Sequence, residues 1–211
     1  MDYIPELKGS VYEGVTIRHL LTMTSGVKWN ESYTSLKSEL VGFSTRKTEP
    51  GVNSIVGFMR DLNREHEVGT RFNYSTGDAS LVGLLVTNAT GKSLSEYLSE
   101  KIWKPYGMEG DALWALDQDG TEIGGCCISA RLQDYARFGQ FMMDGAAING
   151  VSIVPAGWVE RATKSQHIYA RGGRGYGYMW WTYPNQSYIA KGIYGQEMAI
   201  VPTHDLSLIH I

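Results

Sequence analysis

The chain has 211 residues, of which 43% are hydrophobic and 19% are charged, and its formal net charge is -3 at pH 7. This balance excludes a disordered chain, because it supplies enough apolar surface for a packed core. The slightly negative charge and the lack of a basic run argue against nucleic-acid binding. The longest apolar runs, such as LVGLLV, are too short to span a membrane.

The first part of the chain carries helical patterns. Residues 15–26 predict a short helix that Thr16 caps and Gly26 ends. Residues 29–40 predict a polar, aromatic loop, and the polar loop character returns in residues 42–51. Residues 52–72 start as an amphipathic helix and end in a turn around Gly69.

Two further helices follow directly. The apolar stretch 77–92 predicts a helix that Gly91 stops. Residues 93–108 predict another, in which Ser93 and Glu96 form a capping box and which ends before Pro105.

The pattern changes from helices to strands in the second half. Residues 129–145 predict a helix with one apolar face, and residues 155–163 a short helix with a proline near its start. The residues expected on that apolar face are Leu132, Tyr135, Ala136, Gly139 and Met142. After a glycine-rich segment, residues 178–183, 187–195 and 196–202 predict strands of an antiparallel meander. This order predicts an α+β fold.

The two cysteines, Cys126 and Cys127, are neighbours and cannot join distant segments. They follow two glycines and precede a helix. Such a loop can border a cleft, which makes Cys127 a candidate substrate contact, but we favour the interpretation that both cysteines are small buried residues. The histidines show no metal-ligand spacing, so we expect neither a metal site nor a cofactor.

Two matches to the Ser-x-x-Lys pattern of acyl-transfer enzymes occur, at Ser25–Lys28 and at Ser44–Lys47. The pattern works when the serine begins a helix, because the lysine then lies one turn further on beside the hydroxyl. Ser25 instead ends a predicted helix, and Ser44 lies in a predicted loop. We interpret both as structural residues and not as nucleophiles.

Four segments resemble, in this order, the penicillin-recognising serine hydrolases. They are VTIRHLLTMTSGV, FNYSTGDASLVGLLV, GGCCISARLQDYARFGQFM and KGIYGQEMAIVP. That superfamily includes class C β-lactamases, and the chain is most similar to 6-aminohexanoate-dimer hydrolase-like proteins. The resemblance implies a β-lactamase-like fold, with a helical region packed on an antiparallel sheet.

The resemblance also implies roles for four residues. Tyr74 would relay the proton of the nucleophile to the leaving group, which suits a tyrosine if nearby cations lower its pKa from about 10. The backbone N–H of Ile193 would complete an oxyanion hole. Lys191 would lie near the cation of that motif, and Tyr33 would belong to a loop that closes over the substrate. Thr76 stands where many members have asparagine, which leaves the β-lactamase activity itself open.

The family's own Ser-x-x-Lys lies upstream of the region where this chain begins. We therefore expect residues 1–205 to be a partial domain, truncated at both ends and inactive by itself because the nucleophile is missing. Residues 206–211 alternate like a strand, but the string resembles a translated sequencing adaptor, and we expect it to be a non-native tail.

The sequence therefore predicts a fragment of a serine hydrolase that cleaves a small amide or ester through an acyl-enzyme. The alternative is a non-catalytic homologue that binds a peptide, a lactam or a cell-wall fragment. Oligomeric state and compartment do not follow from the sequence, and both the bacterial cytoplasm and the periplasm fit it.

Overall fold

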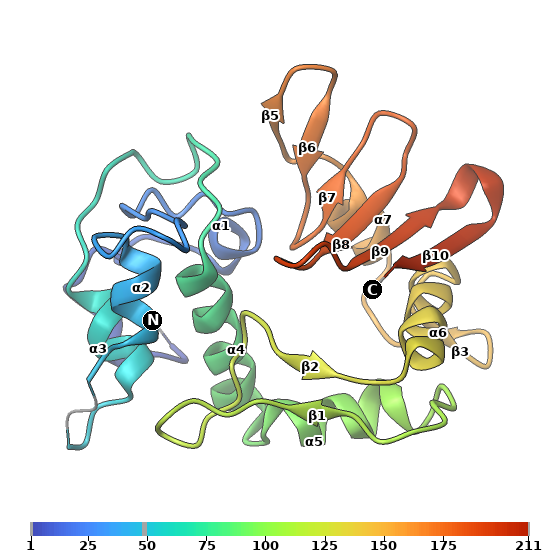
Figure 1. The fold of residues 1–211 in the computed structure, drawn as a ribbon, viewed down its shortest axis with the longest axis horizontal. Helices are drawn as coiled ribbons and strands as arrows, with labels where there is room; N and C mark the ends of the chain where they lie inside the picture. The colour runs from blue at the N-terminus through green and yellow to red at the C-terminus, as the bar shows by residue number, and fades with distance from the viewer. Residues whose placement is uncertain (1, 48–49, 211) are drawn as a thin grey trace. The chain divides into compact units, whose positions relative to one another are not determined.

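A computed structural model describes residues 2–47 and 50–210 and divides the chain into two compact units (Figure 1). The first unit runs to Tyr97 and adds Trp114–Cys127. The second consists of Leu98–Leu113 and the residues from Ile128 onward. Two short strands, β1 (Leu113–Trp114) and β2 (Ile128–Ser129), lie where the chain passes from one unit to the other.

The first unit is helical and is built around α4 (Thr76–Thr90). The other helices of this part are η1 (Pro5–Leu7), α1 (Ile17–Leu21), α2 (Glu39–Ser44), α3 (Ser54–Arg60) and α5 (Leu94–Leu98). Helices α1, α2 and α3 all pack against α4. The core formed in this way contains Ile4, Leu7, Tyr12, Leu20, Val27, Trp29, Leu40, Phe43, Ile55, Val56, Met59, Leu81 and Leu84.

Helix α4 has the predicted stop signal and begins one residue before the predicted stretch, after a cap that the sequence analysis did not name. The Ser75 side chain accepts a hydrogen bond from the Asp78 N–H, and Gly91 ends the helix in the left-handed conformation at φ +67°. Gly83 lets another segment approach closely, because a Cβ there would lie 2.7 Å from the Cα of Gly124. The loop that carries the two cysteines therefore packs directly on α4.

Several other predicted local features are confirmed. Thr16 caps α1, although the helix already ends at Leu21 and does not reach Gly26. Ser93 and Glu96 form the capping box, since each side chain accepts a hydrogen bond from the other residue's N–H. The helical turns after α5 continue as a π-helix, η2 (Ser99–Trp103), and end before the proline as predicted.

The second unit contains an antiparallel sheet in which each strand pairs with its neighbour in the sequence, in the order β10-β9-β8-β7-β6-β5 (Figure 1). The strands are β5 (His167–Ala170), β6 (Arg174–Tyr176), β7 (Trp181–Thr182), β8 (Tyr188–Lys191), β9 (Glu197–Val201) and β10 (Leu206–His210). Helix α6 (Leu132–Met143) packs against β9 and β10. A hairpin of β3 (Ala147–Ile148) and β4 (Val151–Ser152), the helix α7 (Trp158–Thr163) and the turn η3 (Pro202–His204) complete the unit.

The meander was predicted, but two of its strands were missed. Strands β5 and β6 flank the glycine-rich turn and have only four and three residues, too few for a clear alternating pattern. Helix α2 was also missed, because its six residues lie inside two segments predicted as loops. Residues 206–210, which alternate like a strand, form β10 and pair with β9. This pairing does not test whether the segment is native, so its non-native origin stays a prediction.

The predicted apolar face of α6 is partly wrong. Leu132 is exposed, whereas Asp134 is completely buried. Burial alone would raise the pKa of Asp134, but the backbone N–H groups of Glu109 and Gly110 and the guanidinium of Arg137 lower it below its usual value. A carboxylate with this many donors can occupy a buried position that pattern reading gives to an apolar residue.

Within the described residues, no helix is long and apolar enough to cross a membrane.

Candidate active site

Tyr74 lies immediately before α4, and its backbone is fixed by the segments that surround it. The N–H of Asn73 donates to the carbonyl of Met23 at 2.8 Å, and the Asn73 side chain donates to the carbonyl of Trp29 at 3.0 Å. The next residue, Ser75, caps the helix. Tyr74 itself is half-buried. These hydrogen bonds hold the segment that leads into α4 and so position the backbone of Tyr74, as a catalytic group requires.

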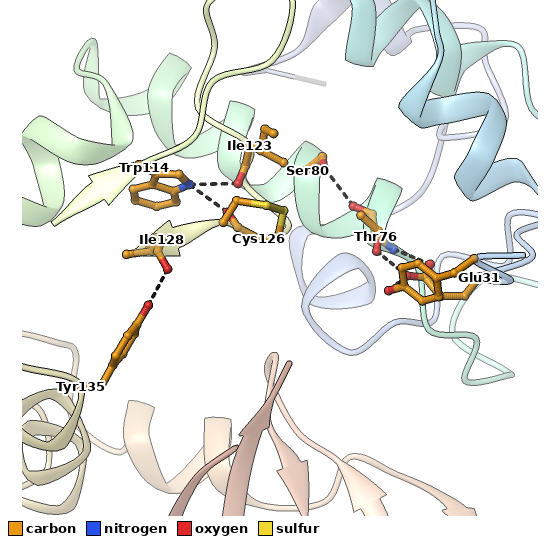
Figure 2. Close-up of a disulfide and its surroundings, with 10 residues drawn as sticks. Glu31, Thr76, Ser80, Trp114, Ile123, Cys126, Ile128 and Tyr135 are labelled. Carbon is orange, nitrogen blue, oxygen red and sulfur yellow. Dashed lines mark hydrogen bonds between the residues drawn. A yellow bond between two sulfur atoms is a disulfide. The ribbon is translucent and has the colours of Figure 1, made fainter. Parts of the chain in front are cut away.

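Glu31 is a member of this cluster that sequence reasoning missed. Its carboxylate accepts hydrogen bonds from the Thr76 N–H at 3.0 Å, from the Thr76 hydroxyl, from the Trp29 indole and from the Tyr33 hydroxyl at 3.1 Å. Figure 2 shows Glu31 beside Thr76. A carboxylate at this point also benefits from the positive end of a 15-residue helix. Glu31 therefore joins the start of α4 to the loop that holds Tyr33.

Burial and the charge of Glu31 raise the pKa values of both tyrosines. Burial raises the pKa of Tyr74, and the negative charge of Glu31 raises it further. Burial, the charge of Glu31, the hydrogen bond to it and the nearby Tyr74 raise the pKa of Tyr33 to about 12. The resemblance implies that nearby cations lower the pKa of Tyr74. In the first unit by itself, burial and Glu31 raise that pKa instead. Both phenols are thus held protonated near neutral pH.

The loop that we expect to close over the substrate has one exposed and one buried aromatic side chain. Tyr33 is 53% exposed, whereas Trp29 is only 5% exposed and stacks edge-on against Phe43. The loop is thus anchored in the core at Trp29 and presents Tyr33 at its surface.

Cys126 and Cys127 are joined to each other by a disulfide, and both residues are exposed. The reading of small buried side chains is therefore wrong. Cys127 has a left-handed backbone at φ +78°, an uncommon conformation for a residue other than glycine. Its role as a substrate contact stays a prediction.

Lys191 and Ile193 lie in the second unit, on the β8–β9 hairpin. The Lys191 ammonium lies 3.0 Å from a carboxylate oxygen of Glu197, and hydrogen bonding to Tyr183 and Glu197 raises its pKa. Ile193 is 53% exposed in a turn that Gly192 and Gln196 close through a 2.7 Å backbone hydrogen bond. Within the described part of the chain, the Ile193 N–H donates to no residue. It is thus free to donate to a ligand.

The structure thus groups the predicted residues in two sets. Tyr33, Tyr74 and Cys127 belong to the first unit, whereas Lys191 and Ile193 belong to the second. Each unit is defined by itself, so the approach of Tyr74 to Ile193 stays a prediction.

The two Ser-x-x-Lys matches have structural roles, as expected. Ser25 is buried and its hydroxyl oxygen accepts a hydrogen bond from the Val27 N–H at 3.4 Å, while Lys28 pairs with Glu39 at 3.5 Å. The Ser44 hydroxyl donates to the Leu40 carbonyl inside α2. Both hydroxyls are thus held by nearby backbone groups.

Among residues 2–47 and 50–210, no group of three or more His, Cys, Asp and Glu side chains is arranged to hold a metal ion.

The chain is 27% identical, over 227 aligned residues, to a 6-aminohexanoate-dimer hydrolase of Paenarthrobacter ureafaciens. The alignment covers 100% of this chain and 57% of that relative. The chain therefore spans little more than half the length of this relative.

Solved structures show the same fold. A Bacillus anthracis protein assigned by name to the 6-aminohexanoate-dimer hydrolases superposes with a TM-score of 0.86 at 24% identity, covering 100% of this chain and 58% of that one. A penicillin-binding protein of Bacillus halodurans superposes with a TM-score of 0.70 at 17% identity, covering 94% of this chain and 67% of that one. These likenesses confirm the expected α+β, β-lactamase-like fold.

The family model described as Beta-lactamase matches residues 1–210, which is nearly the whole chain. Together with the ordered segments of the sequence, this match shows that the chain belongs to the beta-lactamase family.

Proposed function

We propose that this chain forms part of a serine hydrolase that cleaves an amide or ester bond through an acyl-enzyme. The observation that carries the proposal is the placement of Tyr74 directly before α4 and near Tyr33. Glu31 lies close enough for its negative charge to raise the pKa of Tyr74. A phenol that is fixed by its backbone and kept protonated can donate a proton to a leaving group. The family match supports the same chemistry.

In this proposal the acyl transfer uses groups from both units. A serine in the part of the family's length that this chain does not span attacks the carbonyl. Tyr74 passes the proton of that serine to the leaving group, and the Ile193 N–H stabilises the oxyanion. The reacting carbonyl must reach both groups, so the Tyr74 hydroxyl should lie within about 12 Å of the Ile193 nitrogen. A crystal structure of the protein from the complete reading frame tests this distance.

For Tyr74 to accept a proton as well as donate one, a cation must offset the effect of Glu31. A lysine beside the nucleophile would provide that charge, because an opposite charge nearby favours the ionised phenol. Lys191 is less suited to this task, since its charge is already paired with Glu197.

We further propose a linear amide as the substrate class. The relative from Paenarthrobacter is named for the hydrolysis of a 6-aminohexanoate dimer, whose two units an amide joins. The Tyr33 hydroxyl donates to Glu31, and in this proposal its oxygen accepts a hydrogen bond from the leaving nitrogen of an amide. A non-catalytic homologue that binds a related molecule is the alternative, and only the chemistry of a nucleophile separates the two.

Covalent labelling decides between these functions. The protein encoded by the complete reading frame is treated with a fluorophosphonate and analysed by mass spectrometry. We expect one labelled serine, followed three positions later by lysine, and no label on Ser25 or Ser44. No labelled serine would favour the binding homologue, and a label on Ser25 or Ser44 would contradict our reading of those residues.

A further inference from the structure

The disulfide between Cys126 and Cys127 takes no part in the proton and acyl transfers proposed above. Both residues are exposed, and their Cα atoms are 3.7 Å apart at a sequence separation of 1. Figure 2 shows the disulfide beside Trp114 and near Ser80 of α4. A disulfide that closes no long loop adds little to stability, because it restricts few conformations of the unfolded chain.

The loop around the cysteines is held by its backbone and not by the sulfur atoms. The Cys126 N–H donates to the Ile123 carbonyl at 3.2 Å, and the Ala115 N–H donates to the Cys127 carbonyl at 3.0 Å. The Trp114 indole donates to the carbonyls of Ile123 and Cys126 at 3.0 and 3.1 Å. None of these contacts involves a sulfur atom.

The preceding glycines fix the same loop to α4. A Cβ at Gly125 would lie 3.1 Å from the Thr76 carbonyl, and one at Gly124 would lie 2.8 Å from the Cα of Gly83. Neither approach involves a cysteine side chain. The loop that carries the two sulfur atoms is therefore held by backbone hydrogen bonds, by the Trp114 indole and by the close approach of its glycines to α4.

We propose that Cys126 and Cys127 form a reversible thiol–disulfide site that, once reduced, binds thiophilic ligands through both sulfur atoms. Exposure is what allows a thiolate to attack a disulfide sulfur, and exposed disulfides are generally the labile ones. A dithiol reductant supplies two electrons and two protons. The protein's sulfur–sulfur bond breaks, two thiols form, and the reductant becomes a cyclic disulfide.

The reduced pair is suited to a trivalent arsenical. The loop keeps the two thiols next to each other, so both sulfurs can bind one arsenic atom. An aryl arsenic oxide then loses its oxygen as water, which takes up the two thiol protons, and two sulfur–arsenic bonds form. Soft thiolates prefer such soft acceptors to hard cations.

The test uses the chain under native conditions, with intact-mass spectrometry and iodoacetamide as the thiol probe. We expect no alkylation before reduction and two added groups after dithiothreitol. Phenylarsine oxide added after reduction should block both alkylations and add one arsenical per chain. Air or a disulfide oxidant should restore the unreactive form.

Single-cysteine variants are the matched controls. In Cys126→Ser and in Cys127→Ser, the remaining thiol should be alkylated without reductant, and one equivalent of the arsenical should protect it far less well than the pair. Two free thiols in the untreated chain would overturn the proposal. It would equally be overturned if dithiothreitol exposed the thiols only after denaturant was added.

Discussion

The start of α4 and the β8–β9 turn carry the two halves of the proposed chemistry, and they are built in opposite ways. Around α4, Glu31 joins Thr76, Tyr33 and Trp29 through four hydrogen bonds. At the turn, Ile193 is 53% exposed and its N–H has no partner among the described residues. A group that transfers protons needs fixed neighbours, whereas an oxyanion donor must be left unpaired. An unpaired N–H costs little free energy where water can reach it.

The largest difference between the two regions should appear in stability. Leu81 is completely buried in the core around α4, so Leu81→Ala should lower the free energy of unfolding by about 2–5 kcal/mol. Ile193→Ala at the exposed turn should change it by no more than about 0.5 kcal/mol. Urea unfolding of both variants measures these values. An equal loss in the two variants would mean that the turn is as tightly packed as the core.

The second effect concerns pH and also belongs to the α4 region. Burial raises the pKa of Asp78 to about 6, and hydrogen bonds from Ser25 and Tyr12 offset this only in part. The folded chain then holds this proton more tightly than the unfolded chain, whose aspartate has a pKa of about 3.9. The stability contribution of Asp78 is therefore complete below about pH 4 and is lost as the pH rises through about 6.

Asp78→Asn separates this contribution from the rest. The asparagine cannot ionise, so the fall in stability between about pH 4 and pH 6, on the order of 3 kcal/mol at most, should shrink in the variant. Urea midpoints across this pH range, compared with the unmodified chain, give the answer. The same slope in both proteins would show that Asp78 is not its source.

The smallest of these effects tests Glu31 itself. Glu31→Gln keeps the shape and one acceptor oxygen but removes the charge. The pKa of Tyr33 should fall from about 12 towards its usual value, and stability should fall by about 1–2 kcal/mol because charged hydrogen bonds are replaced by neutral ones. Ultraviolet titration of the phenols measures the shift, and Tyr33→Phe identifies the signal. An unchanged Tyr33 titration would remove Glu31 from the account.

Local signals in the sequence were sufficient for much of the fold. The caps at Thr16, Ser93 and Gly91 involve residues within a few positions of one another, so the sequence alone predicts them. The strands of the meander follow from alternation and turns. Helix α2 and strands β5 and β6 have six, four and three residues, which are too few for a clear periodic pattern, and tertiary packing decides their structure.

The candidate site was predicted only in part, because its hydrogen bonds join residues that are far apart in the sequence. Glu31 and Thr76 are 45 positions apart, and no spacing rule connects them. The buried Asp134 depends on donors 24 and 25 positions away. The order of the motifs indicated Tyr74, but the direction of its pKa shift follows from Glu31 and burial, which only the folded chain brings together.

The most direct test of the account is steady-state kinetics of Tyr74→Phe, in the protein from the complete reading frame, on an amide and an ester that are otherwise matched. Loss of the proton relay should lower kcat/KM about 10²- to 10⁴-fold on both substrates. Tyr33→Phe is the control: it should lower activity on the amide more than on the ester, because only the amide nitrogen needs the hydroxyl to leave. If Tyr74→Phe keeps more than about a tenth of the original kcat/KM on both substrates, Tyr74 is not the relay and the proposed mechanism is wrong.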